Sequence, residues 1–221
     1  MKRRDGVSLD PADELTRGDV LLKGTLAVGA IYGLGAVAPY VSRVLASGGG
    51  GDAAVLNYLL PFEYLQVSLY NRASTEINDK GEKLPLGSRE KELLGLFLEE
   101  DGQHVAALKK MIEELGGEPV KKKGYAFAFR IFVQVLGIAT TIEDTSVGAY
   151  NGALSVLDSA EARELVYSIV QVDARHAATV RIGDGENPTP YPFDHAVPEQ
   201  DSIAHVLPYT GEYEEEFKQS G

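Results

Sequence analysis

Residues 63–73 read EYLQVSLYNRA and residues 143–153 read EDTSVGAYNGA, so both follow the pattern E-x3-V-x2-Y-N-x-A. Each is followed by a second pattern, D-x2-H-x-A, at residues 101–106 and again at residues 173–178. Self-similarity of this kind indicates one supersecondary unit written twice. The order of the patterns therefore predicts two similar helical hairpins, each with one glutamate helix and one Asp-x-x-His helix.

Apolar residues recur with helical spacing around these patterns, and the alternation typical of strands is almost absent. The predicted helices cover residues 52–78, a second helix from its N-cap Ser88 to Gly116-Gly117, residues 132–157, and a fourth helix that Asp158 and Glu161 open as a capping box and Gly183 ends. The connection over residues 116–131 spans about 53 Å when extended, whereas a helix of about 26 residues is about 39 Å long. The predicted fold is therefore all-α, a four-helix bundle over residues 52–183 with a crossover between helices 2 and 3.

The absence of cysteine and the negative net charge exclude or disfavour several classes of function. The chain of 221 residues contains no cysteine, which excludes disulfides, thiolate nucleophiles and cysteine zinc sites. Its net charge of −12 argues against a nucleic-acid partner, because phosphates would meet a field of their own sign. Residues 184–221 form an acidic, proline-rich tail that we expect to be extended.

The N-terminal residues 1–46 predict a signal-like or membrane-anchor segment, joined to the bundle by a glycine linker at residues 47–51. Residues 24–42 carry no charge, and residues 16–23, TRGDVLLK, are similar to the twin-arginine export pattern with Gly18 in place of the second arginine. We expect a protein exported to the periplasm or cell envelope, or tethered to a membrane through residues 20–46. The alternative is a cytoplasmic protein in which this segment is a hydrophobic helix packed on the domain.

Six side chains from the repeat are candidate metal ligands, namely Glu63, Asp101, His104, Glu143, Asp173 and His176. An aspartate and a histidine three residues apart lie on one helical face, so each Asp-x-x-His pair can bind one ion. The surrounding residues on these faces are apolar, and an uncompensated charge in a core is costly. Four carboxylates and two imidazoles suit two iron or manganese ions. A buried network of salt bridges and hydrogen bonds is the alternative.

Three further residues bear on this site. Glu100 lies four residues before His104 and is an alternative ligand to Asp101, but the equivalent position in the second repeat is Val172, which cannot bind a metal. Tyr70 and Tyr150 follow the two glutamates by two helical turns, and their hydroxyls can lean back toward the site because long side chains point to the helix N-terminus. They predict either hydrogen bonds to the ligands or two ordinary core tyrosines.

Four stretches carry a family resemblance: LPFEYLQVSLY at residues 60–70, DGQHVAALKKMIEELGGEPV at 101–120, IEDTSVGAYNGA at 142–153 and VDARHAATV at 172–180. With them, residues 52–183 resemble the ferritin-like superfamily, and in particular bacterial ferritin-like domain proteins related to plant desiccation-related proteins. In that superfamily, one Glu from each of two helices and a Glu-x-x-His from each of the other two bind two metal ions. The resemblance implies the same role for the six candidates, although both Glu-x-x-His motifs are Asp-x-x-His here and thus one methylene shorter.

The function implied by the resemblance is that of a di-metal carboxylate protein with two iron ions, alternatively manganese, per chain. Such a protein reacts with oxygen or peroxide, as an oxidoreductase or as an iron-oxidising protein. The alternative from another class is a non-catalytic, stress-related or structural envelope protein that keeps the fold. The sequence leaves self-association into a homo-oligomer open.

The sequence of residues 1–46 predicts export, and this prediction can be tested in cells. Residues 44–46, VLA, place small side chains at positions −3 and −1 of a cleavage site, so the exported chain should begin near Ser47 or keep its leader as a tether. Fractionation of native cells followed by N-terminal sequencing should find the protein outside the cytoplasm or in the membrane fraction. A soluble cytoplasmic protein that retains Met1 or Lys2 would contradict this prediction, and residues 18–46 would then be a packed helix.

Overall fold

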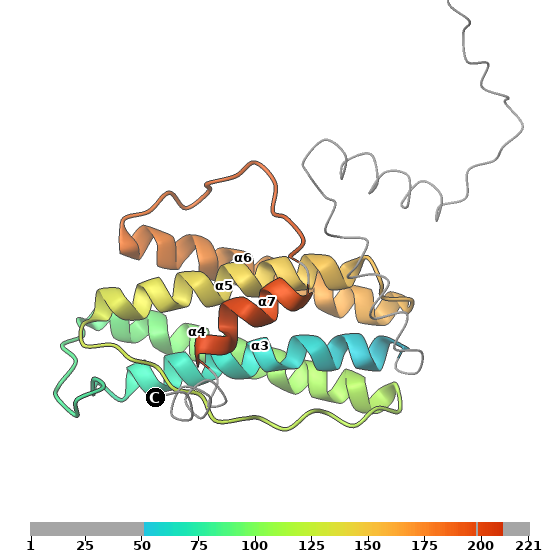
Figure 1. Ribbon diagram of the computed structural model, residues 1–221, viewed down its shortest axis with the longest axis horizontal. Coiled ribbons are helices and arrows are strands. Elements are labelled where there is room, and N and C mark those ends of the chain that lie inside the picture. The colour runs from blue at the N-terminus through green and yellow to red at the C-terminus, as the bar shows by residue number, and fades with distance from the viewer. Residues whose placement is uncertain (1–50, 198, 210–221) are drawn as a thin grey trace, which may run out of the picture. The chain divides into compact units, whose positions relative to one another are not determined.

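A computed structural model describes residues 51–197 and 199–209, and the predicted signal-like segment lies outside this range. Within it the chain folds into helices α3 (Gly51–Ser74), α4 (Ser88–Glu114), α5 (Phe132–Leu154), α6 (Ala160–Asp184) and α7 (Glu199–Val206), with a 3-10 turn at Leu207–Tyr209. The predicted all-α four-helix bundle is confirmed, and α3 to α6 form it (Figure 1). None of the described helices combines the length and the apolar character that a membrane span requires.

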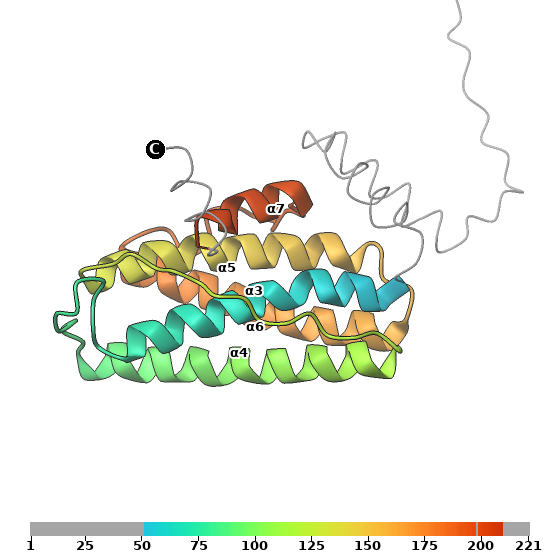
Figure 2. The same cartoon turned by 60° about the horizontal axis from the view of Figure 1, so that its bottom comes forward.

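The four long helices pair as two hairpins, α3 with α4 and α5 with α6, and α3 also packs along α5. The connection between α4 and α5 runs back along the bundle over α3, as Figure 2 shows. The crossover makes α5 antiparallel to α3, so residues near the end of one helix meet residues near the start of the other. This arrangement is what brings the two copies of the sequence repeat face to face.

Several helix ends differ from the sequence expectation. The first helix ends at Ser74 and not near Asn78, because Glu76 has a positive φ of 57° and Ile77 forms an antiparallel bridge with Lys83. The N-cap of α4 is Gly87, and Ser88 is its first residue. The third helix ends at Leu154 before a short turn that extends to residue 159.

The fourth helix also begins and ends later than expected. Its N-cap is Ser159 and not Asp158, since the Ser159 hydroxyl accepts a hydrogen bond from the backbone N–H of Ala162 at 2.9 Å. The helix ends at Asp184 because Gly185, with φ of 79°, adopts the left-handed conformation that closes a helix C-terminus.

The crossover is fixed to α3 by hydrogen bonds from both sides. The Asn57 side chain donates to the carbonyl of Glu118 at 2.9 Å and accepts from the N–H of Val120 at 2.8 Å. Two tyrosine hydroxyls also donate hydrogen bonds of 3.2 Å between the segments, Tyr64 to the carbonyl of Val120 and Tyr125 to the carbonyl of Pro61. The long connection is therefore a layer of the domain that covers the outer side of α3.

The C-terminal tail covers α5 in a similar way. We expected it to be extended, but residues 199–207 contain no proline and form α7 and the start of the 3-10 turn, which lie against the bundle (Figure 2). The N–H of Val197 donates to the carbonyl of Gly148 at 2.9 Å. A Cβ on Gly148 would lie 2.3 Å from Cγ2 of Val197, so only glycine allows this approach.

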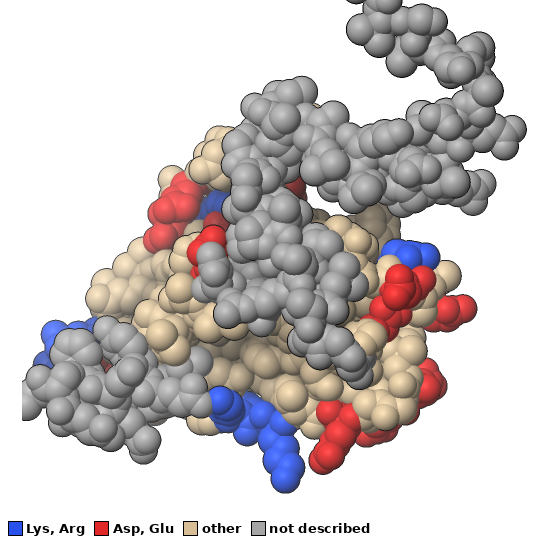
Figure 3. All heavy atoms as spheres, turned by 45° about the vertical axis from the view of Figure 1, so that its right-hand side comes forward, with Lys and Arg blue, Asp and Glu red and all other residues tan. Residues whose placement is uncertain are grey.

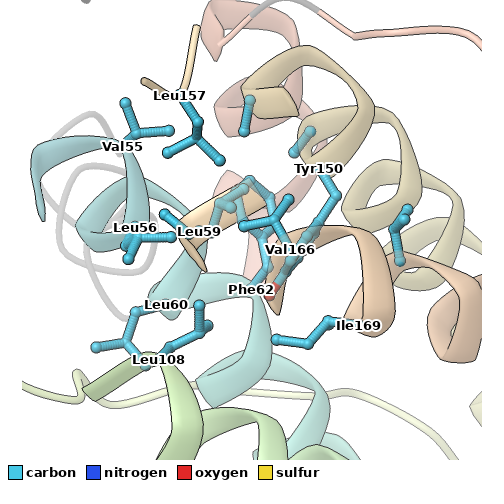
Figure 4. Close-up of a cluster of buried hydrophobic side chains, with 14 of the residues drawn as sticks. Val55, Leu56, Leu59, Leu60, Phe62, Leu108, Tyr150, Leu157, Val166 and Ile169 are labelled. Carbon is cyan, nitrogen blue, oxygen red and sulfur yellow. The ribbon is translucent and has the colours of Figure 1, made fainter. Parts of the chain in front are cut away.

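Two hydrophobic clusters fill the bundle. One includes Leu56, Leu59, Val166 and Ile169, which Figure 4 shows converging from α3 and α6. The other is formed around residues such as Leu69, Leu94, Phe129 and Ile142. Most of their residues come from α3 through α6, and the connections add Leu84, Phe129 and Leu157. Burial of each such side chain contributes about 1.5–3 kcal/mol. The polar candidate ligands lie on the same core faces, along the helices between the residues of the two clusters.

Charged side chains of both signs are scattered over the surface, and some form ion pairs, such as Lys91 with Glu76 at 2.6 Å. The face seen in Figure 3 carries acidic and basic side chains in several small groups, some of which adjoin a group of opposite charge. The described residues therefore show no continuous basic stripe on this face of the kind that follows a nucleic-acid backbone.

Asp52 connects the two hairpins and provides a stability test. Its buried carboxylate accepts from the backbone N–H of Asp158 at 2.8 Å and of Ser159 at 2.7 Å, which ties the start of α3 to the turn between α5 and α6. Asp52→Ala leaves both donors unpaired and should lower the unfolding free energy by about 1–3 kcal/mol. Urea unfolding measures this loss, and the exposed Glu113→Ala is the control. Equal stabilities of the two variants would contradict the assigned role.

Candidate metal centre

The six candidate ligands come together inside the bundle. Glu63 comes from α3, Asp101 and His104 from α4, Glu143 from α5, and Asp173 and His176 from α6. All four carboxylates are fully buried, and the two histidines are buried as well. Each helix of the bundle thus contributes to one polar cluster in an otherwise apolar core.

One group of donor atoms surrounds His104. Its Nδ1 lies 3.2 Å from Oε2 of Glu63, 3.5 Å from Oδ1 of Asp173 and 3.7 Å from Oδ1 of Asp101. One donor atom from each of these four residues lies within 4.8 Å of all the others. Side chains from α3, α4 and α6 therefore converge on a volume the size of one metal coordination sphere.

A second group surrounds His176 and shares a residue with the first. The Nδ1 of His176 lies 3.3 Å from Oδ1 of Asp101 and 3.9 Å from Oε1 of Glu143, and these three residues again place donor atoms within 4.8 Å of one another. Asp101 belongs to both groups, although its side chain is one methylene shorter than the glutamate of the family pattern. The aspartate on α4 reaches the histidine on α6 because the two helices face each other across the core.

The unpartnered atoms of the cluster test whether metal ions fit it. Oδ1 and Oδ2 of Asp101, Oδ1 of Asp173 and Nδ1 of His176 are fully buried and have no hydrogen-bond partner among the described residues. Buried polar groups in folded proteins are nearly always paired. Oε1 of Gln66, Oγ1 of Thr140 and Oγ of Ser202 are also buried without a hydrogen-bond partner among the described residues, but the four atoms above gather on candidate ligands. Carboxylate oxygens and imidazole nitrogens are donors that suit iron and manganese. The residues present therefore fit divalent metal ions.

Tyr70 and Tyr150 cross the bundle to the glutamate of the opposite repeat. The hydroxyl of Tyr70 on α3 donates to Oε1 of Glu143 on α5, and the hydroxyl of Tyr150 on α5 donates to Oε1 of Glu63 on α3. Both tyrosines are fully buried. The antiparallel packing of α3 on α5 produces this reciprocal pair, and each hydroxyl fixes one oxygen of a candidate ligand.

Two other side chains, not predicted from the sequence, donate hydrogen bonds to the carboxylates. Nε2 of Gln66 donates to Oε2 of Glu143 at 2.8 Å, and Oγ of Ser146 donates to Oδ2 of Asp173 at 2.9 Å. Each lies three residues after a repeat glutamate, so the two occupy equivalent positions in the two copies of the repeat. A polar side chain at the same place on both core faces was the signal that could have revealed them.

Glu100, the alternative to Asp101, lies outside the cluster of donor atoms. Its Oε2 is 2.7 Å from Nε2 of His176, on the side of the imidazole ring that faces away from Asp101. The ring of Phe97 stacks on the same histidine with a centroid distance of 4.0 Å. Asp101 is thus the α4 carboxylate that joins the cluster, and Glu100 contacts it through His176.

Burial dominates the electrostatics of the cluster. It raises the pKa of Glu63 to about 8, against which the hydrogen bond from Tyr150 acts. Burial together with the nearby charge of Glu63 raises the pKa of Asp173 to about 7. Burial and neighbouring carboxylates also raise the pKa of Asp101 and of Glu143 well above the usual range. Burial lowers the pKa of His104. Without metal ions, these carboxyls retain protons near neutral pH.

Comparison with known proteins agrees with this architecture. A family model described as the ferritin-like domain matches residues 51–184, which is more than half of the chain. Protein rds1 of Schizosaccharomyces pombe is 23% identical over 159 residues, and the match spans 72% of this chain but only 39% of that protein. The crystal structure of the conserved hypothetical protein rv2844 from Mycobacterium tuberculosis superposes with a TM-score of 0.52 at 17% identity, over 66% of this chain and 96% of that one. At this identity the structural likeness shows the fold alone.

The raised carboxyl pKa values predict how metal-free stability depends on pH. In the unfolded chain Glu63 and Asp173 titrate near pH 4, whereas in the fold they hold their protons up to about pH 8 and pH 7. The folded state therefore binds more protons in this window, and its stability should fall as the pH rises from about 5 to 8, by about 1.4 kcal/mol per pH unit for each proton.

Urea unfolding in the presence of a chelator measures this dependence. Glu63→Gln removes one of the titrating groups and should flatten the pH profile, and the exposed Glu99→Gln should leave it unchanged. Added divalent metal should restore more stability at pH 8 than at pH 6, because ligands bind metal in their deprotonated form. A metal-free profile that is flat from pH 5 to 8 would contradict the raised pKa values.

Proposed function

Because this chain belongs to the ferritin-like domain family, we propose that it is a di-metal carboxylate protein that holds two iron or manganese ions and reacts with oxygen or peroxide. The observation that carries the proposal is the set of buried, unpartnered donor atoms of Asp101, Asp173 and His176. Leaving such atoms without partners costs about 1–3 kcal/mol each. Two divalent ions would satisfy them and balance the four buried carboxylates.

The residues divide between the two ions. One ion would be held by His104 with Glu63 and Asp173, and the other by His176 with Glu143. Asp101 belongs to both groups and would serve both ions. The hydroxyl of Tyr150 holds one oxygen of Glu63 and leaves the other to face His104, whereas both oxygens of Glu143 accept hydrogen bonds, from Tyr70 and Gln66. Both glutamates are therefore oriented without metal.

When bound, the two ions would supply the electrons that reduce oxygen or peroxide, and the protein would provide their surroundings. The carboxyls hold protons in the metal-free state, so ion binding releases them. The apolar clusters on both sides limit the access of water, which strengthens the electrostatic interactions of the bound ions. Oxidation of iron itself and oxidation of a separate substrate are both compatible with these residues.

A non-catalytic stress-related or envelope protein is the other function that this fold supports. In that case the six polar residues would be a buried network, held by bonds such as Tyr150 to Glu63 and Ser146 to Asp173. The unpartnered oxygens of Asp101 favour the metal protein over this alternative. For either function we propose export to the cell envelope on the sequence of residues 1–46.

Metal analysis tests the proposed function. After anaerobic loading with Fe(II), the wild type should contain about two ions per chain, and the double variant Asp101→Asn/Asp173→Asn should lose both because Asp101 serves both groups. The control Glu99→Gln should load fully. Exposure of the loaded wild type to oxygen or peroxide should consume the oxidant and change the near-ultraviolet absorbance.

Two results would count against the proposal. Unchanged metal content in the double variant would remove both aspartates from the site. A wild type that binds no metal, yet keeps full thermal stability in a chelator, would support the non-catalytic protein. Stoichiometric metal without any reaction with oxygen or peroxide would retain the metal site and reject the oxidation chemistry.

A further inference from the structure

The two histidines of the site are held differently, although the repeat makes them equivalent. Both direct Nδ1 toward the carboxylates. Nε2 of His176 meets Oε2 of Glu100 at 2.7 Å, whereas among the described residues no hydrogen bond reaches Nε2 of His104. The cause lies in the sequence, because the residue before Asp101 is Glu100 and the residue before Asp173 is Val172.

A carboxylate hydrogen-bonded to Nε2 fixes the tautomer of a neutral imidazole. A neutral histidine carries one N–H, and a hydrogen bond to a carboxylate places that proton on the bonded nitrogen. In His176 the proton is then on Nε2, and the lone pair of Nδ1 faces Asp101 and Glu143. Partners of this kind also raise the basicity of the ligand nitrogen and fix the ring orientation.

The surroundings of the rings increase this difference. Phe97 stacks on His176 at 4.0 Å between centroids, and only 3% of that side chain is exposed. The position equivalent to Phe97 in the second repeat is Ile169, which is aliphatic, and 11% of the His104 side chain is exposed. Glu100 itself is 37% exposed, so its carboxylate keeps contact with water while it holds a buried ring.

Building on the proposed function, we propose that Glu100 makes the two ion positions unequal by positioning His176. Glu100 strengthens ion binding in the half of the site that contains His176 and Glu143, and has no counterpart in the half that contains His104 and Glu63. Glu100 acts through the histidine and is not itself a ligand, because its oxygen lies on the nitrogen that points away from the carboxylate cluster.

Calorimetric titration of the metal-free full chain with Co(II), under anaerobic conditions, tests this inference. Glu100→Ala should weaken binding of one ion by about 10–100-fold, as loss of such a partner typically does, and should leave the other ion unchanged. Glu100→Gln keeps an oxygen that accepts the N–H and should restore part of the affinity. Glu99→Ala, at the exposed neighbouring position, is the matched control.

The repeat also offers the reverse experiment. Val172→Glu places a carboxylate where the symmetry of the two hairpins aims it at Nε2 of His104, and should strengthen binding of the other ion. A readout without metal is the imidazole nitrogen spectrum, in which His176 of the wild type should carry its proton on Nε2. In Glu100→Ala the same ring should populate both tautomers.

The outcomes separate this inference from the proposed function. If the wild type binds two Co(II) ions and Glu100→Ala changes neither affinity nor the tautomer of His176, the positioning role is wrong and the metal site stands. If Glu100→Ala weakens both ions equally, Glu100 acts through its charge on the whole cluster and the proposed inequality is wrong. A wild type that takes up no Co(II) would overturn the proposed function and this inference with it.

Discussion

The burial of four carboxylates in a helical core is the constraint on which the rest of the structure depends. Each carboxylate lies on an apolar helix face, where an unpaired charge costs more than most single contacts provide. Two of the carboxylates, Glu63 and Glu143, accept hydrogen bonds from tyrosine hydroxyls on the opposite helix. The oxygens of Asp101 have no hydrogen-bond partner among the described residues. The tyrosine hydrogen bonds fix the register of α3 against α5. The buried oxygens of Asp101 must be neutralised by protons or by metal ions.

The two-fold repeat explains the layers that cover the bundle as well as its core. The crossover covers α3 through Asn57 and Tyr64, and the C-terminal tail covers α5 at Gly148. These covering segments are unrelated in sequence, yet they lie on equivalent helices. The two hairpins thus present similar outer faces on α3 and α5, and a different segment of the chain covers each of them.

Positions at which the two copies of the repeat differ give the two halves of the site different hydrogen-bond partners. Gln66 corresponds to Ser146, and they bind Glu143 and Asp173 respectively, so the two halves differ in which carboxylate is held. Glu100 corresponds to Val172, which leaves the two histidines with different partners. A symmetric scaffold with unequal substitutions can hold two ions in different environments without altering the packing of the helices.

The sequence by itself determined the helical fold, the crossover and the six buried residues of the site, because the repeat placed one carboxylate or one Asp-x-x-His on each core face. The end of α3 at Ser74 and the N-cap Ser159 were less determined by the sequence. The bridge between Ile77 and Lys83 follows the first, and the backbone N–H of Ser159 is bound by Asp52 from α3. The exchange of tyrosines between α3 and α5, the shared position of Asp101 and the bond from Glu100 to His176 were decided only by tertiary structure. Each joins side chains on different helices, and the spacing of residues along one helix specifies which face they occupy but not which atoms they meet across the core.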